Sequence, residues 1–158
     1  MVAAAGLFDN QREVNLTSTI TMIEDVLVEL GHFLNDCRDD RAGSIRSWRV
    51  RKGSATVRIS LVDRPDFTHV VIASAVMKLD GAVDRDALFT HLLRENAELT
   101  GAAFALAGDV VLLRTERSTL DLDRSEVQDL IARVQTYADD HDDRLVAIFG
   151  GTLGGELR

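Results

Sequence analysis

The densest group of potential metal ligands runs from Asp139 to Asp143, where His141 has two aspartates on either side. Carboxylate oxygens suit hard cations such as Ca²⁺ and Mg²⁺. The run lies in a segment with helical periodicity, however, and consecutive residues of a helix point around its cylinder, so they cannot converge on one ion. The spacing of an EF-hand, with its central glycine and terminal glutamate, is also missing. We therefore expect a solvated acidic turn and no metal site.

The other residues with reactive side chains also lack partners at a useful spacing. Cys37 is the single cysteine, and the aspartates near it disfavour a thiolate. The four histidines form no His-x-x-x-His pair. Gly150 to Gly155 is rich in glycine, but the few residues after it are too short for the helix whose N-terminus would bind a phosphate. The sequence predicts no catalytic residue, no metal and no cofactor, and so no enzyme.

A basic segment, residues 41–58, is the strongest local charge asymmetry, because it contains no acid in a chain of net charge −8. One interpretation is a patch for an anion or an acidic partner. Single-stranded nucleic acid stacking on Trp48 is a second one. Alternation along a strand directs Trp48 and Val50 away from Arg49 and Arg51, which favours a buried tryptophan and a solvated basic face. The net charge disfavours direct binding to a phosphate backbone. The candidate patch comprises Arg46, Arg49, Arg51, Lys52 and Arg58.

Hydrophobic periodicity predicts the elements that must position these residues. Apolar residues recur every three or four positions in the helical segments and every second position in the strands. The expected order is α-β-β-β-α-β-β-α, which favours an α+β fold with helices packed on an antiparallel sheet. The expected elements are a helix over Leu16–Leu34, strands over Ser47–Lys52, Ala55–Val62 and Thr68–Met77, a helix capped by Asp84, strands over Ala103–Ala107 and Val110–Ser118, and a helix capped by Asp123 that ends near Phe149.

The length of 158 residues and an apolar content of 46% indicate one globular domain. We expect a flexible leader over residues 1–15, the domain over 16–150 and a flexible tail over 151–158. No apolar run approaches the roughly 20 residues of a membrane helix, and the first residues lack the basic start of a secretory signal. A single cysteine fits a reducing compartment, so we expect a cytoplasmic protein that does not act at a membrane.

A group of residues in the C-terminal half forms a recognisable pattern: Leu92-Leu93, Asn96 to Leu99, Ala103 to Leu106, Gly108-Asp109, Val111-Leu112 and Leu120 to Asp123. In these residues the C-terminal half resembles the YbjN-like family of bacterial sensory-transduction regulators, whose fold is similar to class I chaperones of type III secretion. The N-terminal half matches by element order alone. The resemblance implies a small homodimer without enzymatic activity that binds protein clients in extended or partly unfolded form.

Apolar and small side chains on the predicted elements are the candidates for a subunit or client contact. The strand over Thr68–Met77 is apolar on both faces, as expected for a central strand. The next hairpin sets Phe104 and Leu106 opposite a face of alanines, which would allow a helix or a second subunit to approach closely. Asn96 is expected chiefly to fix the junction between helix and hairpin. The candidates are Leu92, Asn96, Leu99, Ala103, Ala105, Ala107, Val71, Ala73 and Ala75.

Together with these residues, the resemblance implies a non-enzymatic, dimeric, chaperone-like adaptor or regulator that binds a protein client. The alternative is a regulator linked to nucleic acid, or to a protein that binds nucleic acid, through the basic segment Arg41–Arg58.

Overall fold

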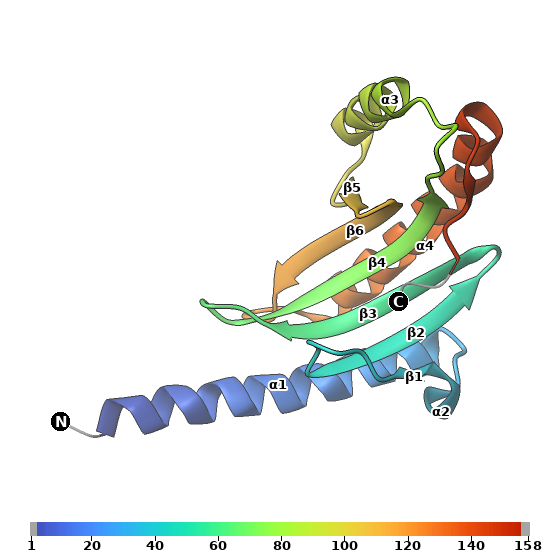
Figure 1. Ribbon diagram of the computed structural model, residues 1–158. Helices are drawn as coiled ribbons and strands as arrows, with labels where there is room; N and C mark the ends of the chain where they lie inside the picture. Colours follow the sequence, from blue (N-terminus) through green and yellow to red (C-terminus); the bar gives the residue numbers. More distant parts are fainter. Residues whose placement is uncertain (1–2, 156–158) are drawn as a thin grey trace.

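The computed structural model describes the backbone of residues 3–155 and the side chains of residues 10–155. A seven-stranded antiparallel sheet lies at its centre (Figure 1). The strand order is β1-β2-β3-β4-β6-β5, and β7 pairs with β4. The elements are α1 (Ala3–Glu29), α2 (Leu34–Cys37), β1 (Arg38–Asp39), β2 (Arg46–Lys52), β3 (Ala55–Asp63), β4 (Thr68–Lys78), α3 (Arg85–Glu98), β5 (Ala103–Ala107), β6 (Val110–Ser118), α4 (Arg124–Phe149) and β7 (Thr152–Leu153).

Local sequence signals set the starts of α3 and α4. The side chain of Asp84 accepts a hydrogen bond from the backbone N–H of Ala87 at the start of α3. Asp123 and Glu126 form a capping box at the start of α4, since each side chain accepts a hydrogen bond from the other's backbone N–H. Both caps were predicted from the sequence, and they fix where each helix leaves the sheet.

The helices α1 and α4 cover one face of the sheet, and the other face is open (Figure 1). Trp48 and Ile59 are fully buried between β2, β3 and these two helices. A second cluster forms where α3 and the end of α4 meet β5 and β6, and it includes Leu88 and Phe104. Burying a large apolar side chain stabilises the fold by about 1.5–3 kcal/mol. The two clusters therefore hold the helices to one side of the sheet.

The strand β4 is central, as its apolar character on both faces predicted, because it pairs with β3 on one side and β6 on the other. Its register with β6 shifts between Ala75 and Met77. Where β4 runs past the first residues of β3, β7 replaces β3 as the neighbour of β4 at Met77 and Lys78. The sheet thus continues past the β2–β3 hairpin.

The structure differs from the expected elements at four places. The helix expected from Leu16 begins at Ala3, so helix extends through most of the segment expected as a leader. The same helix, expected to run to Leu34, ends at Glu29. Residues 35–46, for which no helix or strand was expected, contain most of α2 and the short strand β1. In the segment expected as a tail, Thr152 and Leu153 form β7. None of the helices in residues 3–155 has a stretch long and apolar enough to cross a bilayer.

Candidate binding surfaces

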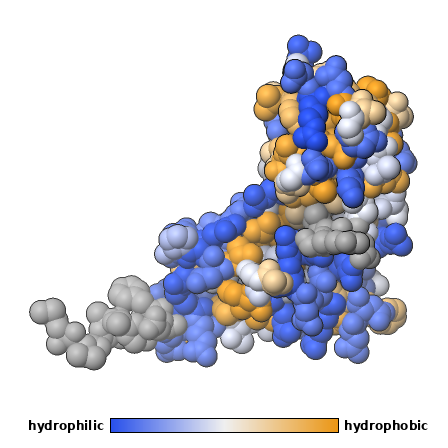
Figure 2. Space-filling model, in the orientation of Figure 1, coloured by the Kyte–Doolittle hydropathy of each residue, from blue (hydrophilic) through white to orange (hydrophobic). Residues whose placement is uncertain are grey.

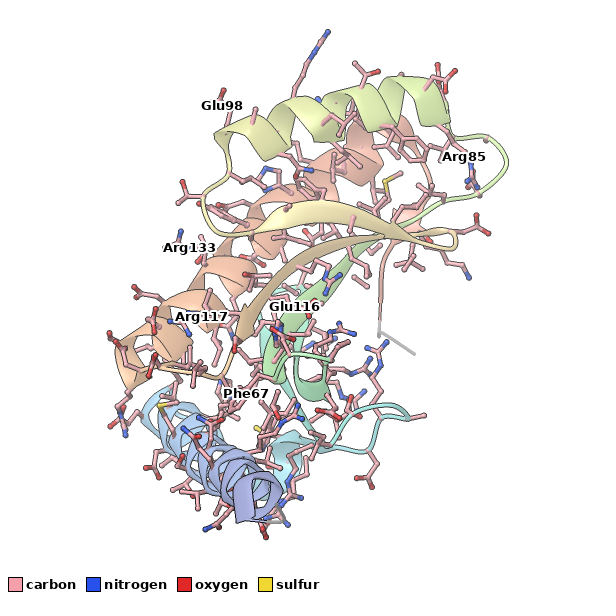
Figure 3. All side chains as sticks on the ribbon, turned by 90° about the vertical axis from the view of Figure 1, so that its left-hand side faces the viewer. Phe67, Arg85, Glu98, Glu116, Arg117 and Arg133 are labelled. Atoms are coloured by element: carbon pink, nitrogen blue, oxygen red, sulfur yellow. The ribbon has the colours of Figure 1, made fainter. Side chains whose placement is uncertain are left out.

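The open face of the sheet carries small and basic side chains in rows that run across the strands. One row joins Arg49, Arg58, Ala73, Arg114 and Ala103, which are cross-strand partners from β2 to β5. Side chains on alternate positions of these strands point to the helices instead. In Figure 3, Arg117 points toward α4 and its neighbour Glu116 toward the opposite side of the sheet. The open face is thus a surface of arginines around a column of small residues.

Two carboxylates neutralise part of this face. Asp39 on β1 accepts a hydrogen bond from Nε of Arg58 at 2.6 Å and lies 3.9 Å from Nη2 of Arg49. Glu116 lies 2.7 Å from Nε of Arg64 and also pairs with Arg114. The hydrogen bond from Arg64 is the main reason that the pKa of Glu116 is lowered and that of Arg64 is raised. Glu116 is therefore held ionised as the shared partner of two guanidinium groups.

A groove of about 330 Å³ lies on the open face between the loop of residues 41–44 and the β5–β6 hairpin. Its floor is formed by Val71, Ala73 and Ala105, and arginines stand at its rim. The full lining comprises Arg41, Ala42, Gly43, Ser44, Ser60, Val62, Arg64, Val71, Ala73, Ala105, Leu106, Ala107, Leu112 and Arg114. The groove therefore has an apolar floor and a polar rim.

A second, apolar surface lies where α3 meets β5. Leu93 on α3 is 70% exposed and Leu106 on β5 is 48% exposed, whereas Leu92 and Phe104 beneath them are buried. A smaller groove of about 180 Å³ runs between the two elements. Figure 2 shows hydrophobic residues gathered over α3 and its neighbours, while the region over β1 and β2 is mostly hydrophilic. Exposed apolar side chains that cluster in this way indicate a protein contact.

Asn96 joins α3 to β5 as predicted. Its Nδ2 donates to the backbone oxygen of Phe104 at 3.2 Å, and the backbone N–H of Phe104 donates to its Oδ1 at 2.6 Å. The carboxylate of Glu95, one residue earlier, lies 3.2 Å from Nε2 of His141 and 3.4 Å from Nη2 of Arg144 on α4. These contacts set the position of α3 relative to both of its neighbours.

The structure divides the predicted contact residues between the two surfaces. Val71, Ala73, Ala75, Ala103, Ala105 and Ala107 lie at register positions of the open face. Asn96, together with the buried Leu92, lines the smaller groove between α3 and β5. Leu99 is half-buried against the second cluster. Sequence reasoning thus named residues of both surfaces but did not separate them.

The predicted basic patch is also divided, between the two faces of the sheet. Arg49, Arg51 and Arg58 lie on the open face. Arg46 and Lys52 occupy positions opposite Leu61 and Ala55 and therefore share the register of the covered face. Trp48 is buried, as its alternation with the arginines predicted. Sequence reasoning missed Arg64, Arg114, Asp39 and Glu116, which belong to other segments, although the period of two in β6 assigns Arg114 and Glu116 to one face.

The segment with acidic side chains, predicted to be a solvated turn, is part of the continuous helix α4. Asp142 is buried and accepts a hydrogen bond from the hydroxyl of Ser54 at 2.7 Å, while Asp139 accepts one from the backbone N–H of Ser54 at 3.2 Å. The expectation of a turn was wrong because these carboxylates attach α4 to the β2–β3 hairpin. In the part of the chain that the structure describes, no group of three His, Cys, Asp or Glu is placed to hold a metal. Burial, followed by Asp36, raises the pKa of the Cys37 thiol, which opposes activation.

The fold is shared with several solved structures. A chain of the ExsC-ExsE complex aligns with a TM-score of 0.59 and 11% identity, over 82% of this chain and 94% of that one. A chain of the HopA1-SchA chaperone-effector complex aligns with a TM-score of 0.57 and 12% identity, over 83% and 97%. A chain of the complex between the Yersinia pestis type III secretion chaperone SycH and a stable fragment of YscM2 aligns with a TM-score of 0.51 and 17% identity, over 75% of this chain and 94% of that one. No curated protein matches the sequence.

The sequence itself matches a family model. The model is TY-Chap1, described as "T3SS (YopN, CesT) and YbjN peptide-binding chaperone 1", and it matches residues 18–154. This range covers both surfaces described above and confirms the YbjN resemblance of the C-terminal half. The chain belongs to the TY-Chap1 family of peptide-binding chaperones.

Proposed function

We propose that this protein is a non-enzymatic, chaperone-like adaptor that works as a homodimer and holds a segment of a protein client in extended form. The observation that carries the proposal is the match of a peptide-binding chaperone family over residues 18–154. Related folds come from complexes such as the HopA1-SchA chaperone-effector complex. The buried, unpaired thiol of Cys37 fits a reducing compartment, so we place this work in the cytoplasm.

The apolar surface of α3 and β5 is the proposed subunit contact. A two-fold dimer uses one surface patch on both subunits, and the exposed Leu93 and Leu106 offer such a patch. Ala105 lines the groove between α3 and β5 as well as the groove on the open face, and its small side chain allows close approach. The rest of the open face then remains for the client.

The dimer is tested by Leu93→Glu, because an exposed leucine can be exchanged without disturbing the core. Light scattering should give twice the 17.4 kDa chain mass for the unchanged protein and 17.4 kDa for the variant. Leu120→Glu is the matched control, since Leu120 is also exposed, at 48%, but lies on the loop after β6. A Leu93→Glu protein that keeps the mass of the unchanged protein would show that this surface is not the subunit contact. Ala105→Glu should lower the mass in the same way.

Client binding is tested by affinity capture from the native host, followed by reconstitution with the purified partner. The captured protein should bind through a short segment that becomes protected from hydrogen exchange only in the complex. A synthetic peptide of that segment should bind alone, because an extended segment needs no fold of its own. A partner that binds only as a folded domain would contradict the proposal. Conversion of a small molecule by the purified protein would contradict it too.

A link to nucleic acid is the competing proposal. Its support is that Arg49, Arg51 and Arg58 share one face of the sheet. The competition experiment described below decides between the two.

A further inference from the structure

We propose that the groove on the open face selects clients by charge, and that its occupant is an acidic, extended stretch of the client. This inference rests on the proposed function, because it names the chemistry of the segment that the adaptor would hold. The excess of positive charge around the groove, the shape of its floor and a buried arginine next to that floor support the proposal.

Positive charge exceeds negative charge on the open face, although the chain as a whole is acidic. Asp39 pairs with Arg49 and Arg58. Glu116 pairs with Arg64 and Arg114, so two carboxylates are shared by four arginines. Arg41, at the rim of the groove, makes no ion pair with any residue from 10 to 155. A carboxylate that enters the groove therefore meets guanidinium groups that still have donors to offer.

The floor of the groove suits an extended chain with small or branched apolar side chains. Val71, Ala73 and Ala105 form a shallow apolar strip between the arginines. In an extended peptide, successive side chains point to opposite sides. One side of the peptide can then rest on the strip, while acidic groups at the flanking positions reach Arg41, Arg64 and Arg114. Alternating acidic and apolar residues fit this arrangement best.

Arg58 lies next to the floor of the groove, and its Nε is bonded to Asp39. It is 6% exposed, lies beside Ala73 in the register of β3 and β4, and its Nη1 has no hydrogen-bond partner among the described residues. Charges interact more strongly where water is excluded, because the effective dielectric constant falls. A buried, incompletely paired guanidinium therefore favours an anionic occupant over a neutral or basic one.

The test uses the full chain and three short, unstructured synthetic peptides in which alanine and valine alternate with glutamate, glutamine or lysine. Binding is measured by fluorescence anisotropy at low salt. The glutamate peptide should bind most tightly and the lysine peptide most weakly. The preference should largely disappear in about 1 M salt, where the Debye length is about 3 Å. Single-stranded oligo-dT is added as a competitor to represent nucleic acid.

Two variants locate the effect. Arg41→Gln should weaken binding of the glutamate peptide about two- to fivefold, as expected for one exposed charge pair, and leave the glutamine peptide unchanged. Arg46→Gln is the matched control. It also removes one positive charge, but from a position of β2 on the covered face, and it should not change the affinity for any of the peptides. Arg41 is exposed and unpaired among the described residues, so its substitution should not unfold the protein.

Equal affinity for the glutamate and glutamine peptides would overturn the inference and leave the adaptor function standing. An equal loss in Arg41→Gln and Arg46→Gln would overturn it too, because the effect would then be one of overall charge. Tighter binding of oligo-dT than of the glutamate peptide would reject it in favour of nucleic acid. If none of the peptides binds, and the partner recovered from the host also fails to bind as a peptide, the proposed function fails as well.

Discussion

The side chain of Asn96 should be worth more to stability than its half-buried position suggests, because it serves as the missing neighbour of an edge strand. The strand β5 pairs with β6 on one side only. On its other side, both backbone groups of Phe104 are bonded to Asn96, at 3.2 and 2.6 Å. We predict that Asn96→Ala destabilises the protein by removing both hydrogen bonds at once.

The magnitude follows from the two bonds. Each contributes about 0.5–1.5 kcal/mol net, which gives about 1–3 kcal/mol for the pair. In a domain of this size, each kcal/mol lowers the melting temperature by about 2–4 °C. Urea denaturation followed by circular dichroism measures the change as a lower midpoint at unchanged slope. Because α3 also carries Leu93, the variant should dimerise more weakly if α3 forms the subunit contact.

The control for this prediction is Asn35→Ala, since Asn35 is exposed and has no side-chain hydrogen bond among the described residues. Its free energy of unfolding should stay within about 0.5 kcal/mol of that of the unchanged protein, as for other surface substitutions. If Asn96→Ala were as stable as Asn35→Ala, water would be replacing the side chain without loss. The idea that Asn96 completes the edge of β5 would then be wrong.

Two further predictions concern the open face. Glu116 has a lowered pKa in the folded protein, so its contribution to stability is present above its ordinary pKa of 4.5 and is lost as the pH falls through the lowered value. The difference in free energy of unfolding between the unchanged protein and Glu116→Gln is measured by urea denaturation. It should be constant near neutral pH and shrink below about pH 4.5. A difference that stays the same below about pH 4.5 would contradict the prediction. At Gly154, a Cβ atom would lie 2.4 Å from the backbone C and O of Ala75, so Gly154→Val should detach β7 from β4. The backbone N–H of residue 154, which donates to the backbone oxygen of Val76, should then exchange rapidly with solvent. Gly81→Val, where a Cβ atom would meet open space, should leave that protection unchanged.

Strong local signals made much of the fold predictable. The strands Ala103–Ala107 and Val110–Ser118 were predicted with their observed bounds, because the Gly108-Asp109 turn separates two runs of clear alternation. The caps at Asp84 and Asp123 were predicted because a short acidic side chain before an apolar helical pattern satisfies free backbone N–H groups. In each case the decisive interaction lies within a few residues of the chain.

The elements that the sequence did not reveal depend on distant partners. The strand β1 consists of two polar residues, and its pairing with Ser47 and Trp48 on β2 is what makes it a strand. The strand β7 forms on Met77 and Lys78, more than 70 residues earlier in the sequence. Similarly, the acidic residues in α4 were misjudged because Ser54, which bonds to Asp139 and Asp142, lies on a different hairpin. Such short segments carry no periodicity of their own, so their structure follows from tertiary contacts.

The basic segment shows why a run of charge along the chain differs from a charged surface. Alternation divides Arg46 and Lys52 from Arg49 and Arg51, so the run does not form one patch. The surface that does form runs across the strands. Arg64 joins it from the β3–β4 turn, and Arg114 joins it from β6, where the register sets it beside Ala73. A binding surface on a sheet is therefore better sought among cations spaced by two residues on several strands than in one continuous run. By that criterion, the arginines that matter most for the open face are those that flank its column of alanines.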